Sequence, residues 1–257
     1  MAGLRASRRI GDLTFQEIGT ALRASSILCL PLGSMEQHGP HLPINTDCVL
    51  AEALTARIVE RWGEEHDLWQ LPSLPFGLSR EHAWAAGTLS FSVAGMTAYL
   101  RDLGSEIVRA LPARNLLVVN GHGGNRGMLE AVGRELRGDF GLNLCSLHLG
   151  AMLGDDPSAV VPEIHAARDE TSLMLALAPH LVRRELLPVG PSADAGAIRG
   201  FVLDPAVSWP WSSDDRRIAR DGVIGDASAA SAEHGHAIVA RVTEVVGAVL
   251  RRLREGA

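Results

Sequence analysis

The sequence predicts an α/β protein in which a largely parallel β-sheet carries helices on its faces. Short apolar runs that read as buried strands alternate along the chain with segments of helical periodicity, an order typical of parallel sheets. The clearest of these runs, residues 115–120, is apolar from Leu116 to Val119, as expected of a strand covered on both faces. A length of 257 residues suffices for one large α/β domain, and we assign residues 1–257 to it.

The individual elements follow from the spacing of the apolar residues. A strand is expected at 27–32, where a short apolar run ends in Gly33 and Ser34. A helix is expected at 48–62, where apolar residues recur at intervals of three and four. The expected strands are 27–32, 68–72, 115–120 and 142–147, and the expected helices are 48–62, 95–111, 128–136, 171–181 and 232–253.

The stretch 188–225 has a different composition from the rest of the chain. It is rich in Gly, Pro, Ser and Asp and contains Trp209 and Trp211 on either side of a proline. We expect either a long excursion over the functional site or a surface loop packed by its tryptophans.

Composition excludes several classes of protein. The net charge of -6 lacks the basic excess needed to neutralise a phosphate backbone, so no nucleic-acid partner is expected. No apolar run reaches the roughly 18 residues that a membrane span requires. The first ten residues lack the apolar stretch of a secretory signal, and a cytoplasmic location is the resulting expectation.

Reactive side chains narrow the chemistry further. The three cysteines, Cys29, Cys48 and Cys145, have no CxxC spacing, so neither disulfides nor a thiolate zinc site are expected. All 24 basic residues are Arg, which excludes a Schiff-base lysine, a P-loop lysine and a Ser–Lys dyad. The chemistry is therefore expected to come from His, carboxylates and metal.

The first cluster of metal-ligand residue types follows the strand at 27–32 and comprises Glu36, His38, His41 and Asp47. Glu36 and His38 occupy alternate positions of an extended segment and should point to the same side, which favours ligation. His41 fits a ligand or an outer-shell histidine that orients one. Asp47 precedes a predicted helix and would also suit an N-cap, although its neighbours favour ligation.

The second cluster is the turn 120–125, which contains His122, Gly123 and Gly124 and stands between a strand and a helix. Glycines there let the backbone turn tightly and approach a ligand. Ligands of open α/β sheets bind outside the carboxyl ends of the strands, so this turn and the first cluster should meet. A serine hydrolase is disfavoured because the chain has no Gly-x-Ser-x-Gly nucleophile motif.

The third cluster is the polar stretch 163–172, which opens a predicted helix. His165 and Glu170 could both face a site beside the start of that helix. Asp169 and Glu170 would equally serve to complement the helix dipole.

These motifs together resemble the creatininase (creatinine amidohydrolase) family. The resemblance rests on segments 33–43, 45–47 and 120–125, and on His165 with Glu170-Thr171-Ser172. It implies a three-layer α/β/α fold, a homo-oligomer that is usually a hexamer, and two adjacent divalent metals that hydrolyse a C–N amide bond. By matching positions, it implies that Glu36 and His122 bind one metal, that His38 binds the other, and that Asp47 bridges both. His165 matches the histidine that handles protons.

One departure from creatininase itself concerns Gly124. Creatininase carries a carboxylate at that place to complete the shell of the second metal, so another ligand is needed here, and Glu170 is the motif-matched candidate. The Gly-Gly turn is similar to that of other branches, namely a formamidopyrimidine deformylase and the mycofactocin precursor peptidase. Those branches favour Glu-His followed by Phe-Pro-Gly-Thr, whereas this chain keeps Glu81-His82 and Gly87-Thr88 but has Ala85-Ala86 for Phe-Pro.

The implied chemistry is amide hydrolysis. Mixed His and carboxylate ligands suit Zn, Mn or Fe(II), and metals about 3.5–4 Å apart would hold a bridging water and lower its pKa. Backbone N–H groups near Gly123 and Gly124 would stabilise the oxyanion, His165 would pass a proton to the departing nitrogen, and Glu81 or His82 would hold the substrate.

The resulting functional hypothesis is a metal-dependent amidohydrolase acting on a small-molecule amide such as a lactam or formamide. Two alternatives are kept: a mycofactocin-type precursor peptidase of the same family, and a metal-binding assembly protein without catalysis.

Overall fold

A computed structural model describes residues 7–153 and 161–256. Its centre is a four-stranded sheet in the order β2-β1-β3-β4, in which every strand pair is parallel. The strands are β1 (Ile27–Leu32), β2 (Leu68–Gln70), β3 (Asn115–Asn120) and β4 (Asn143–His148). Leu32 pairs with Asn120, and Asn120 with His148, so β1, β3 and β4 end together at one edge of the sheet.

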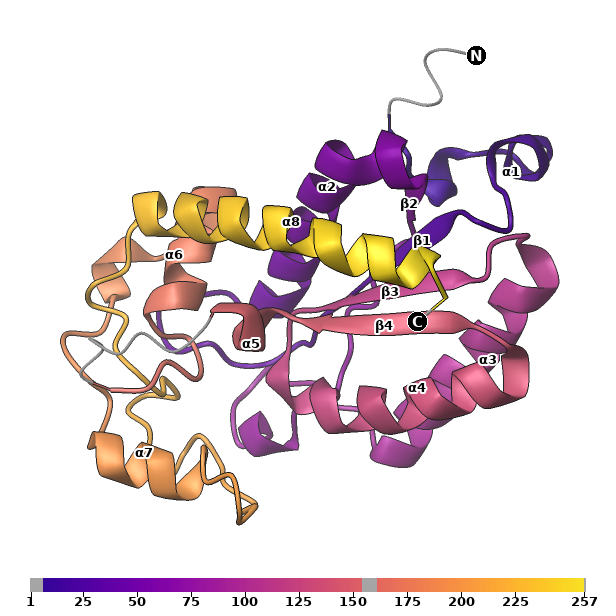
Figure 1. The fold of residues 1–257 in the computed structure, drawn as a ribbon. Coiled ribbons are helices and arrows are strands. Elements are labelled where there is room, and N and C mark those ends of the chain that lie inside the picture. The colour runs from indigo at the N-terminus through magenta and orange to yellow at the C-terminus, as the bar shows by residue number, and fades with distance from the viewer. Residues whose placement is uncertain (1–6, 154–160, 257) are drawn as a thin grey trace.

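Helices cover both faces of this sheet, as Figure 1 shows. The α-helices are α1 (Phe15–Ala21), α2 (Thr46–His66), α3 (Val93–Ala110), α4 (Arg126–Phe140), α5 (Leu149–Leu153), α6 (Arg168–Leu177), α7 (Ala195–Phe201) and α8 (Ala232–Arg254). Helices α2, α6 and α8 lie on one side of the sheet and α3 and α4 on the other. The predicted α/β class with a parallel sheet is therefore confirmed, and the layers are α/β/α.

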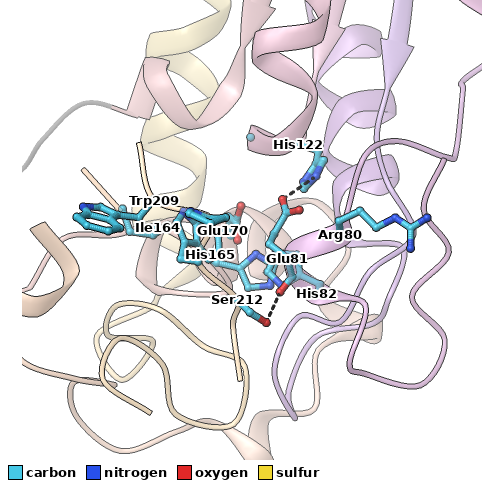
Figure 2. Close-up of a pocket in the computed structure, with 13 residues that line it drawn as sticks. Arg80, Glu81, His82, His122, Ile164, His165, Glu170, Trp209 and Ser212 are labelled. Carbon is cyan, nitrogen blue, oxygen red and sulfur yellow. Dashed lines mark hydrogen bonds and ion pairs between the residues drawn. The ribbon is translucent and has the colours of Figure 1, made fainter. Parts of the chain in front are cut away.

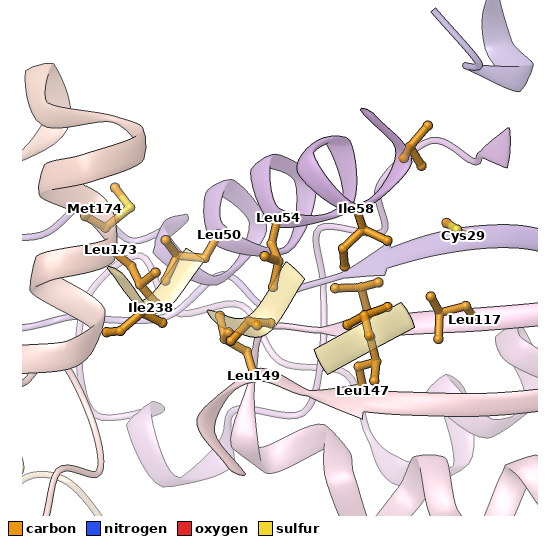
Figure 3. Packing of buried hydrophobic residues seen from close by; sticks show 14 of the residues in the cluster. Cys29, Leu50, Leu54, Ile58, Leu117, Leu147, Leu149, Leu173, Met174 and Ile238 are labelled. Carbon is orange, nitrogen blue, oxygen red and sulfur yellow. The ribbon is translucent and has the colours of Figure 1, made fainter. Parts of the chain in front are cut away.

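The strand residues alternate between two cores because successive side chains of a strand point to opposite faces. Ile27 and Cys29 pack with Leu50, Leu54 and Ile58 of α2 and with residues of α6 and α8 (Figure 3). The other core lies between the opposite sheet face and helices α3 and α4. Its members include Leu28, Leu30, Met96, Leu100, Val118, Val132 and Leu136. Burial on both faces explains why the strands read as continuous apolar runs rather than alternating ones.

The predicted strands and helices all occur in the structure, with ends that differ by a few residues. The helix expected at 171–181 is α6, which begins at Arg168 and ends at Leu177. It stops there because Ala178 precedes Pro179, and the proline ring disfavours a helical backbone at the residue before it. Helices α1, α5 and α7, of five to seven residues, were not predicted. Among the described residues, no helix is long and apolar enough to cross a bilayer.

The 188–225 stretch crosses over the carboxyl edge of the sheet. It contains α7 and forms a small core of its own, in which Ile198, Ile218 and Ile224 are fully buried. Trp209 and Trp211 line a cavity at the strand ends. The structure therefore agrees with the first of the two alternatives, in which this stretch extends over the functional site.

Candidate metal centre

Five side chains from four backbone segments converge at the carboxyl edge of the sheet. Glu36 and His38 lie on the segment after β1, Asp47 in the first turn of α2, His122 directly after β3, and Glu170 in the first turn of α6. All but Glu170, whose side chain is 18% exposed, are buried. The three sequence clusters, which extend from residue 36 to residue 170 of the chain, thus form one site.

Two glycines allow these segments to come so close. A Cβ atom at Gly33 would lie 2.5 Å from the backbone N of Cys48, and one at Gly121 would lie 2.5 Å from the carbonyl O of Asp47. Real Cβ contacts are never this short, so the first turn of α2 can sit against the ends of β1 and β3 only with glycine at both positions. These contacts place Asp47 between His38 and His122.

The five side chains form two groups of three that share Asp47. In the first group, His122 Nδ1 lies 3.2 Å from Glu36 Oε2 and 3.3 Å from Asp47 Oδ2. In the second group, His38 Nε2 lies 3.1 Å from Asp47 Oδ1 and 3.9 Å from Glu170 Oε2. Within each group the candidate ligand atoms lie within 4.8 Å of one another, close enough for one metal ion to contact all three.

Backbone carbonyls fix which nitrogen of each histidine faces the carboxylates. His122 Nε2 is 2.7 Å from the carbonyl O of Leu78, and His38 Nδ1 is 3.2 Å from the carbonyl O of Glu36. A carbonyl oxygen only accepts, so these nitrogens carry a proton and the opposite nitrogens are the ones that face the carboxylates. When it is unprotonated, each of those opposite nitrogens presents a lone pair to carboxylate oxygens, which are also acceptors. Such an arrangement is favourable with a cation between the groups, and it is the second-shell pattern of metal-binding histidines.

The electrostatics of the cluster point the same way. Burial alone would lower the pKa of His38, but the Asp47, Glu170 and Glu36 carboxylates outweigh it and raise the pKa to about 9. The pKa of His122 is likewise raised well above its usual value, against the effect of burial, by Glu36 and Asp47. Two buried carboxylate oxygens, Glu36 Oε1 and Asp47 Oδ2, have no hydrogen-bond partner in the part of the chain that the structure describes. The site therefore has a strong demand for positive charge, which fits divalent cations.

His165 lies beside these groups, forms a further group of candidate ligands with Glu36 and His38, and is oriented in the same manner. Its Nε2 is 2.8 Å from the carbonyl O of Gln37, so its Nδ1 lone pair faces Glu36 Oε1 at 3.6 Å. Its ring stacks on that of His82 with a centroid distance of 4.1 Å. Burial, with a smaller effect from His82 and His38, lowers the pKa of His165 well below its usual value. A neutral imidazole with a free nitrogen toward the site is suited to accept and return a proton.

Gln37 is a residue to which the sequence reasoning gave no role. Its Nε2 lies 2.9 Å from His82 Nδ1, 3.0 Å from His165 Nε2 and 3.1 Å from Ser213 Oγ. Its position between Glu36 and His38 could have indicated a role at the site. Alternation along an extended segment, however, predicts that the Gln37 side chain points away from the side that Glu36 and His38 share. The structure shows that it points to the histidines on the other side of the segment, where its side-chain N–H can donate to His82 Nδ1 and its backbone carbonyl accepts from His165 Nε2.

Ser79 was missed for a different reason. Its Oγ donates a 2.5 Å hydrogen bond to Glu36 Oε2, and it also contacts Ser34. Nothing in the local sequence distinguishes this serine, because its role depends on a loop that returns to the end of β1.

Three open alternatives from the sequence have structural answers. The N-cap of α2 is Asn45, and the Asp47 carboxylate turns to the histidines instead of capping the helix. Glu170 both faces the site and bonds the backbone at the start of α6. Its Oε2 lies 3.9 Å from His38 Nε2 and accepts a 2.6 Å hydrogen bond from the Ala166 N–H. His41 lies 2.8 Å from Thr171 Oγ1 and belongs to neither group.

A cavity of about 660 Å³ opens onto these residues (Figure 2). It is lined by every remaining residue that the sequence reasoning placed at the site, namely Glu81, His82, Gly123 and Gly124, together with His122, His165 and Glu170. The excursion contributes Trp209 to Ser212 to the lining, and the Ser212 hydroxyl donates to the carbonyl O of Glu81. The volume lies within the range of small-molecule binding sites.

Gly124 has no room for a side chain. A Cβ atom there would collide with the carbonyl O of Leu78 and would lie 2.5 Å from His122 Nε2 and 2.6 Å from Glu81 Oε1. The space beside the turn is thus filled by the Glu81 side chain and the backbone at Leu78. This crowding explains why position 124 is a glycine and not a residue with a carboxylate side chain.

Comparisons with known proteins agree with this geometry. A family model described as creatinine amidohydrolase matches residues 11–250. The mycofactocin precursor peptide peptidase of Mycobacterium tuberculosis is 34% identical over 244 residues, covering 91% of this chain and 88% of that protein. The creatinine amidohydrolase of Pseudomonas putida is 30% identical over 253 residues, covering 90% and 91%.

Solved structures show the same likeness. A Zn–Zn form of a mutant creatininase superposes with a TM-score of 0.79 and 28% identity, covering 96% of this chain and 98% of that chain. A manganese form of creatininase gives a TM-score of 0.77 and 27% identity with the same coverage. The chain therefore belongs to the creatinine amidohydrolase (creatininase) family.

Proposed function

We propose that this protein hydrolyses a C–N amide bond with two divalent metal ions. The proposed ligands are Glu36, Asp47 and His122 for one ion and His38, Asp47 and Glu170 for the other. The single observation that carries the proposal is that His38 Nε2 and His122 Nδ1 face buried carboxylate oxygens, an arrangement that needs positive charge between the groups, which a metal ion supplies in place of a proton. This ligand set suits Zn, Mn or Fe(II), and two of the related solved structures are a zinc form and a manganese form of creatininase.

The two cations would supply a polarised amide carbonyl and a water molecule nucleophilic at neutral pH. The residues of the chain then have separate tasks. His165 accepts a proton at Nδ1 and returns it to the departing nitrogen, and its Nε2–H stays with the Gln37 carbonyl throughout. The backbone N–H groups of Gly123 and Gly124 lie at the cavity wall and donate to the oxygen of the tetrahedral intermediate. Glu81 and His82 hold the substrate.

We propose a small-molecule amide such as a lactam or formamide as the leading substrate class. A second candidate, trimming of a precursor peptide, is supported by two observations. The cavity of about 660 Å³ is larger than a small lactam needs, and a relative 34% identical to this chain is named a peptide peptidase. Assembly as a homo-oligomer stays a prediction, which light scattering tests directly.

The experiment is a screen of the protein loaded with Zn, Mn or Fe(II) on lactams, formamides and short peptides, with release of a primary amine or formate as the signal. We expect one class to be hydrolysed, and the chelated protein to be inactive until metal is restored. A protein that binds two metals per subunit but releases nothing from the panel would favour the non-catalytic assembly protein instead.

A further inference from the structure

Two oppositely charged neighbours, Arg80 and Glu81, line the cavity without neutralising each other. They belong to the 3-10 turn Arg80–His82, next to the candidate metal centre. No ion pair joins them within the described part of the chain, and Figure 2 shows their side chains diverging. Glu81 extends toward His122, whereas Arg80 extends in the direction away from Trp209.

The Glu81 carboxylate is placed to accept a hydrogen bond from a ligand. Its side chain is 19% exposed, and its Oε1 lies 3.6 Å from His122 Nε2. That nitrogen already donates to the Leu78 carbonyl. In residues 7–153 and 161–256, no other side chain donates a hydrogen bond to this carboxylate. An N–H group of a substrate bound near His122 would supply the missing donor.

Arg80 offers the complementary group. It is exposed, it is the only basic side chain other than histidine that lines the cavity, and the structure gives its guanidinium no ion-pair partner among the described residues. Other arginines of the fold, such as Arg101 with Glu135 and Asp139, do form such pairs. A planar guanidinium at a cavity wall is well suited to bind a carboxylate through two parallel hydrogen bonds.

Building on the proposed function, we propose that the leaving group of the scissile amide is an amino acid with a free carboxylate. The amide N–H donates to Glu81, and the carboxylate of the leaving amino acid binds Arg80. Hydrolysis then forms a C–O bond from water to the acyl carbon and breaks the C–N bond. The proton from water ends on the nitrogen, so the products are a carboxylic acid and an amino acid. Substrates of this class are N-acyl amino acids and peptides with a free C-terminus.

The test compares matched substrates that differ only at the recognised group. N-formyl- and N-acetyl-amino acids, and dipeptides, are each supplied as the free carboxylate and as the carboxamide. The proteins are wild type, Arg80→Gln, Arg80→Lys and the control Arg134→Gln, which changes an exposed arginine of α4 outside the cavity. Metal content and the unfolding midpoint are measured for each protein to confirm that it is folded and loaded.

We expect wild type to prefer the free carboxylate in kcat/KM by about 10- to 100-fold, as for a charge-assisted hydrogen-bonded pair. Arg80→Gln should bring this ratio close to one, mainly by raising KM for the carboxylate; Arg80→Lys should restore part of it, and Arg134→Gln should match wild type. Equal cleavage of both forms by wild type, or an unchanged ratio in Arg80→Gln, would overturn the inference while leaving amide hydrolysis intact. Absence of cleavage of any amide would overturn the proposed function itself, and the inference with it.

Discussion

Oδ1 of Asp47 lies 3.1 Å from Nε2 of His38, although the two residues reach this point from opposite directions, one from the first turn of α2 and one from the segment after β1. The second carboxylate oxygen faces Nδ1 of His122 at 3.3 Å. One carboxylate therefore belongs to both groups of three, and its removal should affect both ions rather than one.

We expect Asp47→Ala to lose metal and activity together, because each group would keep only two of its three ligands. Metal content after dialysis and turnover of the best amide substrate measure the two effects. Asp47→Asn keeps the side-chain volume and separates the loss of charge from the cavity that alanine leaves. Asp102→Asn, on the exposed side of α3, serves as the control. Full metal occupancy in both Asp47 variants would show that the ligand assignment is wrong.

His165→Ala should have the opposite profile. The metal content should stay at the wild-type level, whereas kcat should fall by about 100-fold or more, as for removal of a general acid–base group. The exposed His180 is the control, and His180→Ala should leave both quantities unchanged. A variant that turns over normally, or that loses its metals, would contradict the assigned role.

The turn after β3 offers two adjacent glycines with different surroundings. A Cβ atom at Gly124 would press on the Leu78 carbonyl, His122 and Glu81, whereas one at Gly123 would meet no atom within 4 Å. Gly124→Ala should therefore displace His122 or Glu81 and lower kcat/KM strongly, and Gly123→Ala should lower it far less. Kinetics with metal analysis on both variants checks this. Equal effects would mean that crowding at this turn is unimportant.

The contact between α6 and α8 predicts a difference in stability. A Cβ atom at Gly235 of α8 would overlap the carbonyl O of Ser172 in α6, and that carbonyl cannot move without shifting the helix. Gly235→Ala should cost about 1–3 kcal/mol in the free energy of unfolding, as overpacking does. Gly138 of α4 faces open space, so Gly138→Ala should instead stabilise by about 0.4–1 kcal/mol. Urea unfolding of the holoprotein measures both; a neutral Gly235→Ala would refute the close contact.

The sequence predicted correctly those features that short stretches of chain encode, namely buried strands and the ligand-type residues that follow them. The run 115–120 was recognisable as a strand because it is buried on both faces, and Asp47 and His122 were recognisable because ligand-type residues follow strands. Helix α7 was missed because it has seven residues and packs in a small core of its own, so it has no long apolar stripe. Gln37 and Ser79 were missed because their partners lie far away in the sequence.

The sequence by itself determined the fold class, the edge of the sheet where ligands bind, and the chemical types gathered there, because burial periodicity and the geometry of parallel strands are encoded locally. Only the tertiary structure decided how those residues divide into two groups around Asp47, which histidine nitrogen faces which carboxylate, and that Arg80 lines the cavity beside Glu81. These features depend on backbone carbonyls and loops that are brought together by folding, and no periodicity of the chain records them.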